Sequence, residues 1–485
     1  MNRLPHSLVS RTTFGTLLLA TLGAPGIGYA QPSGRTTAIT HVTVVDVEGA
    51  RLRKDMTVVI VGERLEVVAP ASTAAIPAGA RIVSGKGKFL ISGLYDMHLH
   101  LAKTGERSLD LLVANGVTSV RDMGGDFALV SRWRAEIADG RRIGPRIKTP
   151  GPILESATNV ARMLAEGTVE PVRRFRAPIG GAGDVDRVVD SVASLGVDFL
   201  KVRTVASADV LAQIGTAARR HRLALVGHSL GSVDAMIGAG QASIEHSVIP
   251  PLLSGSVDDR RQNIRRLVEA GIVFVPTMLV GPKSLAVPDS VATRIVDDNG
   301  SAFDARRRYV GGYLLSDWRE QVAERRAEQP VDWAAVTPRL LEVLQEIRRA
   351  GGVFLTGTDA AVALIYPGFA LHDELELMVA SLGMTPSEAL AAATSAPARF
   401  LGEGDSLGSI AEGKLADLVL LSADPLADIR NTRCLEAVVR GGRLYDRRAL
   451  DRLLDRAAYS PARKQRLAGS DAAPGGGCGL ARGAR

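Results

Sequence analysis

Short apolar runs alternate with stretches of helical periodicity between residues 94 and 401. The helical stretches include residues 109–114 and 210–218, where apolar positions recur every three or four residues. The strand candidates between the helices are residues 94–100, 117–122, 146–149, 197–202, 223–228, 242–246, 272–276 and 353–359. Eight strands that alternate with helices predict an α/β fold of the (β/α)8 TIM-barrel type, whose active sites lie at the carboxyl ends of the strands.

Both ends of the chain carry a different pattern, made of β-branched runs divided by polar turns. These runs fill residues 37–83 and return at 416–421 and 435–440. The simplest arrangement joins both ends in one small β-sandwich into which the barrel is inserted. We therefore expect the following organisation: β-sandwich segments at 31–91 and 405–450, a barrel at 92–404, and a terminal helix with a flexible tail at 451–485.

The seventh crossover of this barrel, residues 279–350, is unusually long for a connection between two barrel elements. Long insertions at the carboxyl ends of strands often carry binding residues. We expect this segment to hold extra helices and part of a substrate pocket.

The first thirty residues have the pattern of a secretory signal peptide. Arg3 and Arg11 precede an apolar run at 14–22, and Gly28-Tyr29-Ala30 resembles a cleavage site before Gln31. A membrane anchor is the alternative, but the apolar run is short for a bilayer and is followed by Gly and Pro residues. We expect cleavage after residue 30, a secreted or periplasmic protein, and no stable membrane anchor.

The composition indicates a chain that can bury a large hydrophobic core and whose positive charge is spread along the sequence. The chain has 485 residues, 46% of them hydrophobic, and a net charge of +7. The basic residues are spread along the chain without interleaved aromatic residues, which is typical of a solvated surface and not of a nucleic-acid site. We expect no nucleic-acid partner, and the sequence is compatible with a homo-oligomer without specifying one.

Candidate chemistry begins at the first predicted strand of the barrel. His98 and His100 share one face of it because side chains alternate along a strand, and two neutral imidazoles suit a zinc-like cation. Taken alone, the pair favours a different interpretation, in which one buried, hydrogen-bonded histidine lies beside an exposed one. Four further metal-ligand candidates lie at or near the ends of other predicted strands: Lys201, His228, His246 and Asp359.

Two more residues are candidates for substrate binding. Arg203 has the same strand parity as Lys201, so it could hold a substrate carboxylate or form a salt bridge inside the barrel. His372, after the eighth predicted strand, could line the pocket or orient a loop. The neighbouring acidic residues Asp373, Glu374 and Glu376 are expected on a solvated helix.

Six segments together resemble the metal-dependent amidohydrolase superfamily, in its imidazolonepropionase-like and prolidase-like branch. The segments are GLYDMHLH at 93–100, TSVRDMGG at 118–125, IEH at 244–246, GTD at 357–359, LHDELEL at 371–377 and GKLADLV at 413–419. The resemblance spans nearly the whole chain after residue 30 and also implies the β-sandwich at both ends. Ser92, where a proline is common, and Leu230, where similar enzymes often carry histidine, depart from the pattern.

The resemblance implies a role for each ligand. Lys201 is expected to react with carbon dioxide and give a carbamate that bridges two divalent cations, which family analogy indicates to be zinc. His98, His100 and Asp359 would complete one metal site, and His228 and His246 the other. A metal-activated water would attack the substrate carbonyl, and Asp359 would move its proton to the leaving nitrogen.

The leading hypothesis is therefore a secreted binuclear metallohydrolase that cleaves an amide bond in a small substrate, such as a dipeptide or an N-acyl amino acid. Two alternatives stay open. One is a cyclic-amide hydrolase like imidazolonepropionase, against which export and Lys201 both count. The other is a non-catalytic binding protein on the same scaffold, which the loss of a ligand would favour, and no ligand is missing.

Overall fold

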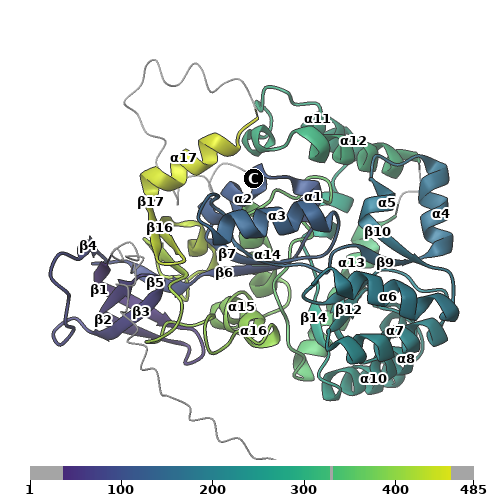
Figure 1. The fold of residues 1–485 in the computed structure, drawn as a ribbon, viewed down its shortest axis with the longest axis horizontal. Coiled ribbons are helices and arrows are strands. Elements are labelled where there is room, and N and C mark those ends of the chain that lie inside the picture. Colours follow the sequence, from purple (N-terminus) through teal and green to yellow (C-terminus); the bar gives the residue numbers. More distant parts are fainter. Residues whose placement is uncertain (1–35, 328–330, 460–485) are drawn as a thin grey trace, which may run out of the picture. The chain divides into compact units, whose positions relative to one another are not determined.

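The computed structural model describes residues 36–327 and 331–459 (Figure 1). The expected signal peptide at 1–30 and the tail after residue 459 lie outside the described residues. The last described helix, α17, spans Arg447–Ala457.

Strands from both ends of the chain pair in one eight-stranded sheet (Figure 1). The junction is the antiparallel pair β5 and β15, in which Leu90 lies opposite Leu420. Its strands are β1 (Thr37–Asp46), β2 (Arg51–Val61), β3 (Arg64–Pro70), β4 (Arg81–Ser84), β5 (Phe89–Ser92), β15 (Leu418–Leu421), β16 (Leu435–Arg440) and β17 (Arg443–Asp446).

The described strands from both ends of the chain form this one sheet, and they do not confirm the expected β-sandwich. Strand β1 pairs with β4 through Thr37–Thr40 and with β5 through Thr43 and Val44. Between these two stretches its register with β2 shifts, and His41 has a positive φ. Such irregularities bend a strand, so one sheet can serve both β4 and β5 and enclose its own apolar cluster.

The middle of the chain forms two parallel sheets, which confirms the α/β class. The three-stranded sheet contains β6 (Leu94–Leu99), β7 (Val117–Asp122) and β8 (Arg146–Lys148). The six-stranded sheet contains, in spatial order, β10 (Arg176–Ile179), β9 (Ile153–Ser156), β11 (Leu200–Val202), β12 (Leu225–Gly227), β13 (Gln241–Glu245) and β14 (Val273–Val275). Strands β9 and β10 were not among the predicted eight.

A closed barrel, which the sequence predicted, is not formed by the described strands. On one side, residues 353–360 connect the sheets, because Phe354 bridges to Phe274 of β14 and Ala360 to Leu99 of β6. On the other side, β8 and β9 do not pair. Pro150 and Pro152 lie between those two strands, and proline cannot donate a ladder hydrogen bond.

Helices follow most of the parallel strands and bury one apolar stripe each, as in α7, whose Val210, Ile214 and Ala217 are buried. Outside the long crossover they are α1 (Leu101–Thr104), α2 (Arg107–Ala114), α3 (Phe127–Ala138), α4 (Ala157–Glu166), α5 (Val172–Phe175), α6 (Val185–Ser194), α7 (Ala208–His221), α8 (Val233–Ala239), α9 (Pro250–Leu253), α10 (Val257–Glu269), α14 (Phe369–Ala380), α15 (Pro386–Ala392) and α16 (Ser395–Phe400). Short 3-10 turns are η1 (Ala182–Asp184) and η4 (Ile429–Arg433).

The long crossover is helical, as the sequence predicted. It contains the π-helical turn η2 (Gly281–Leu285), α11 (Asp289–Val296), the 3-10 turn η3 (Ala305–Tyr309), α12 (Gly312–Ala327) and α13 (Trp333–Arg349). Trp318 of α12 is fully buried in a separate apolar cluster with Tyr366, so part of the crossover has its own small core.

Among the described residues, no helix is both long and apolar enough to cross a membrane.

Candidate metal centre

The structure gathers the six predicted ligands at one edge of the parallel sheets. His98 is in β6, and Lys201 is in β11. His100, His228 and His246 follow the ends of β6, β12 and β13, and Asp359 lies in the segment that connects β14 to β6. Parallel strands end together, so residues far apart in the sequence meet there.

His98, His100 and Asp359 form the first group. The Asp359 Oδ1 atom lies 3.5 Å from Nε2 of His98 and 3.6 Å from Nε2 of His100. The opposite ring nitrogens already have acceptors, because Nδ1 of His98 donates to Glu245 at 2.8 Å and Nδ1 of His100 donates to the Gly124 carbonyl at 3.1 Å. These bonds fix the tautomers and leave both Nε2 lone pairs facing Asp359.

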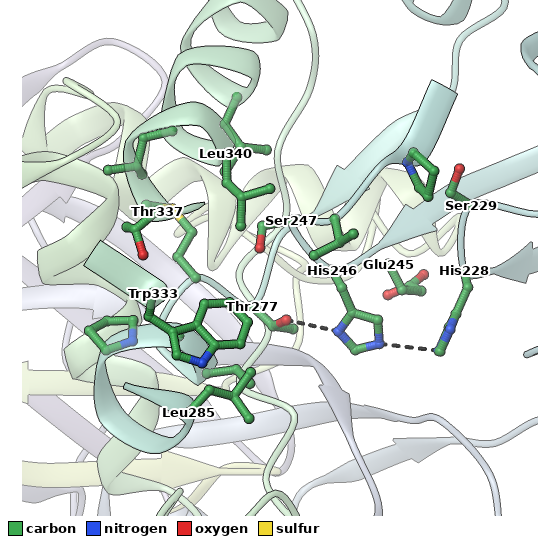
Figure 2. Close-up of a pocket in the computed structure, with 18 residues that line it drawn as sticks. His228, Ser229, Glu245, His246, Ser247, Thr277, Leu285, Trp333, Thr337 and Leu340 are labelled. Carbon is green, nitrogen blue, oxygen red and sulfur yellow. Dashed lines mark hydrogen bonds between the residues drawn. The ribbon is translucent and has the colours of Figure 1, made fainter. Parts of the chain in front are cut away.

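His228, His246 and Lys201 form the second group. The two Nε2 atoms of His228 and His246 are 3.2 Å apart, and Nδ1 of His246 is 2.9 Å from Thr277 Oγ1 (Figure 2). His246 Nδ1 also lies 3.7 Å from Asp359, which joins the two groups. The Lys201 side chain is fully buried, and its Nζ atom has no hydrogen-bond partner among the described residues.

The histidines are held as neutral imidazoles. The pKa of His100 and of His246 falls to about 3, mainly because both rings are buried. The positive charge of Lys201 also lowers both pKa values. Burial also raises the pKa of Asp359 to about 6 and lowers the pKa of Lys201 to about 8. Neutral imidazoles and a free amine are the forms that accept a metal or carbon dioxide.

This donor set fits divalent cations. Two atoms bound about 2.0–2.2 Å from one tetrahedral cation lie about 3.3–3.6 Å apart. The distances from Asp359 to His98 and His100 match that spacing, and one ligand atom from each residue lies within 4.8 Å of the others. Nitrogen and carboxylate ligands of this kind suit zinc and similar metals.

Two ligands have strained backbones. His246 has a φ of 71° and Asp359 a φ of 55°, in the left-handed region that L-residues other than glycine rarely adopt. Such conformations cost about 1–3 kcal/mol each and persist where surrounding contacts fix them. Both residues are candidate ligands, and strained conformations of this kind cluster at functional sites.

A buried ion pair behind His98 was not assigned a role from the sequence. Arg121 of β7 binds both carboxylate oxygens of Glu245 at 2.8 Å and donates to the Met97 carbonyl at 2.7 Å. Glu245 in turn accepts the hydrogen bond from His98. The sequence did contain a signal for this pair, because Arg121 is a charged residue in a buried strand, and buried charges need a partner.

Replacing Arg121 with methionine should lower the free energy of unfolding by about 3–5 kcal/mol, because Glu245 would remain buried without its partner. Urea unfolding followed by circular dichroism measures this loss. In the double variant Arg121→Met/Glu245→Leu both charges are gone, so the loss should be smaller than the sum of the two single losses. Additive losses would contradict a coupled pair.

The two predicted substrate-binding residues lie in different environments. Arg203 is partly exposed, and its Nη1 lies 3.5 Å from the buried carboxylate of Glu155, so it forms the salt bridge that was one of its two expected roles and still reaches solvent. His372 is buried, and its ring nitrogens bond Thr432 and the Asn115 carbonyl at 3.0 and 3.1 Å. Its contacts fit the alternative of orienting a loop, and they leave no ring nitrogen for a substrate.

Glu374 differs from its expected place on a solvated helix. It is fully buried, and its carboxylate accepts hydrogen bonds from the backbone N–H groups of Met278 and Leu279, both at 2.8 Å. Thr277, which bonds His246, directly precedes that segment. Glu374 therefore fixes the start of the long crossover beside the histidines.

Comparison with known proteins gives a consistent picture. The model of the amidohydrolase family matches residues 89–445. Ochratoxinase from Aspergillus niger is 24% identical over 416 residues, which cover 73% of this chain and 75% of that protein. Imidazolonepropionase from Symbiobacterium thermophilum is 24% identical over 393 residues, covering 77% and 84% of the two chains.

Solved structures resemble the fold to a similar degree. The crystal structure of a Xaa-Pro dipeptidase with methionine in its active site gives a TM-score of 0.64 at 21% identity, covering 85% of this chain and all of that one. The crystal structure of Aspergillus niger ochratoxinase gives 0.63 at 21%, covering 85% and 96%. At these identities the likeness establishes a shared fold.

Proposed function

The chain belongs to the amidohydrolase family and is a hydrolase of carbon–nitrogen bonds, and from this premise we propose that it cleaves an amide of a small substrate with a binuclear metal centre. The observation that carries the proposal is the meeting of four neutral histidines, one aspartate and one unpartnered buried lysine in two adjoining groups.

In this proposal, His98, His100 and Asp359 would hold one cation, and His228 and His246 would hold the second. Lys201 would contribute to both as a carbamate, because a protonated amine cannot act as a ligand whereas a carbamate offers two anionic oxygens. A buried Nζ without a hydrogen bond is otherwise costly, and the bridge would satisfy it. We propose zinc for both positions, and such cations would acidify a water and polarise the substrate carbonyl.

Asp359 is the proposed proton carrier. Its carboxylate lies between the two ligand groups, 3.5 Å from His98 and 3.7 Å from His246, so it can reach a water held at either one. Asp359 accepts the proton of the attacking water and delivers it to the leaving nitrogen. Glu245 and Thr277 hold His98 and His246 in orientation during these steps.

We propose an N-acyl amino acid or dipeptide as the substrate, with Arg203 as the group that meets its carboxylate. The guanidinium is partly exposed and only loosely paired with Glu155, so it can add a second carboxylate partner. Neither ligand group lacks a member, which favours an enzyme over a binding protein on the same scaffold.

Metal removal tests the proposal. Purified protein is expected to contain two metal ions per chain and to hydrolyse members of a panel of dipeptides, N-acyl amino acids and lactams. A strong chelator should abolish hydrolysis, and added zinc should restore it. One metal per chain, or turnover only of lactams, would instead favour the cyclic-amide alternative.

Export is also proposed, on the pattern of residues 1–30. N-terminal sequencing of protein recovered from outside the cytoplasm should begin at Gln31.

A further inference from the structure

A cavity of about 440 Å³ opens beside His228 and His246 (Figure 2). Its volume falls within the range of about 300–1,000 Å³ that small-molecule sites occupy. Ser229 and Thr277 lie beside the two histidines, and most of the remaining lining is apolar. The cavity therefore starts at the two candidate metal ligands, His228 and His246, and extends into an apolar space.

One wall of the cavity is a single face of helix α13. The lining residues of this helix recur every three or four positions, and they are Trp333, Thr337, Leu340, Leu341 and Leu344. This spacing places them in one stripe. Leu285 and Pro282 of η2 also line the cavity, so the long crossover supplies much of its apolar surface.

The wall is held in place before any ligand binds. Arg260 of α10 bonds Glu346 and Glu342 of α13 at 2.8 and 2.7 Å. Glu374 fixes Met278, which also lines the cavity. A preformed wall lets apolar contacts contribute to binding without first ordering the chain.

The charges around the cavity decide which part of a substrate enters it. No lysine or arginine is among the residues that line it, whereas Glu245 is. Beyond the metal ligands at its mouth, a carboxylate in this cavity would lose its hydration without gaining a cationic side chain as partner. Arg203 is outside the lining, so the carboxylate of an N-acyl amino acid would stay outside and its acyl group would face the cavity.

We propose that this cavity, whose wall includes Trp333 and Leu340, is the acyl-group subsite. It selects amides whose acyl group is an aromatic ring or a long alkyl chain. This inference rests on the proposed function. Trp333 and Leu340 are the selecting residues, since both offer apolar surface to the cavity from one face of α13.

The test compares N-benzoyl-L-alanine with N-acetyl-L-alanine as substrates of the metal-loaded protein. The benzoyl compound should have the higher kcat/KM by at least about tenfold, the lower end of what one methylene group discriminates in an apolar pocket. Leu340→Trp, which fills the cavity, should bring the ratio close to one. Ala335→Trp adds the same side chain to an exposed position of α13 and should leave the ratio unchanged.

Thr337→Phe fills the cavity from a partly exposed position and serves if Leu340→Trp does not fold. Hydrolysis without an acyl preference, or a preference that survives both filling variants, would overturn the inference. If neither compound is hydrolysed, the proposed function fails. The subsite is then tested separately, by calorimetric measurement of N-benzoyl-L-alanine binding to chelator-treated protein. Binding of N-benzoyl-L-alanine that both filling variants lose would support it, and absent or unaltered binding would overturn it.

Discussion

Replacing Asp359 with asparagine is expected to lower kcat by about 10²–10⁴-fold, the contribution of a positioned general acid–base group. Asparagine keeps one ligand oxygen and tolerates the left-handed backbone of this position better than most residues. The variant should therefore fold and retain most of its metal, which elemental analysis measures beside steady-state kinetics. The loss is assigned to proton transfer only if both metals stay bound.

Asp373→Asn is the matched control. That carboxylate lies on α14 and pairs with Arg433 at 2.6 Å, so its loss should leave kcat unchanged. Near-normal turnover in Asp359→Asn would remove this residue from the proton path and leave it as a ligand alone.

Replacing Lys201 with alanine is expected to lower the metal content from two ions per chain to one or fewer, with a parallel loss of turnover. The variant would remove the proposed bridge and no hydrogen bond, because within residues 36–327 and 331–459 the Nζ atom has no hydrogen-bond partner. It also removes an amine whose burial is unfavourable, as its lowered pKa indicates. The fold should therefore persist. The number of metal ions per chain in the purified variant then shows directly whether Lys201 is needed to hold them.

Lys148→Ala is the control for a general effect of losing a lysine. Its ammonium is partly exposed and pairs with Glu403 at 3.3 Å, outside the two ligand groups, so metal content should stay at two. Two tightly bound ions in Lys201→Ala would refute the carbamate bridge while leaving the histidine sites standing.

The hydrophobic pattern placed five of the six candidate ligands correctly relative to the strands, because His98 and Lys201 lie in strands and the other three histidines directly follow one. The predicted strand 117–122 coincides with β7, and the predicted strands that end at His228 and His246 match β12 and β13 within two residues. Strands β9 and β10 escaped detection because they are four residues long and contain Glu155, Arg176 and Pro178. Such short polar segments are stabilised by their neighbours in the sheet and not by their own pattern.

Tertiary partners explain the remaining differences. Glu374 was predicted on a solvated helix because nothing near it in the sequence indicates a partner. The backbone N–H groups that bind it belong to Met278 and Leu279, nearly one hundred positions earlier. His372 is held by Thr432 and Asn115, which lie 60 and 257 positions away in the sequence. Local patterns carry no information on such pairs, so the ligand positions were predictable and their supporting contacts were not.

The pairing of β5 with β15 also affects how the chain can fold. Nearly the whole parallel region separates these strands, so their contact requires closure of a very long loop. The first-made strands lack this neighbour until residues 418–421 have left the ribosome. Because β6 and His98 follow β5 directly, we expect the metal centre to become rigid late in folding, after synthesis is almost complete.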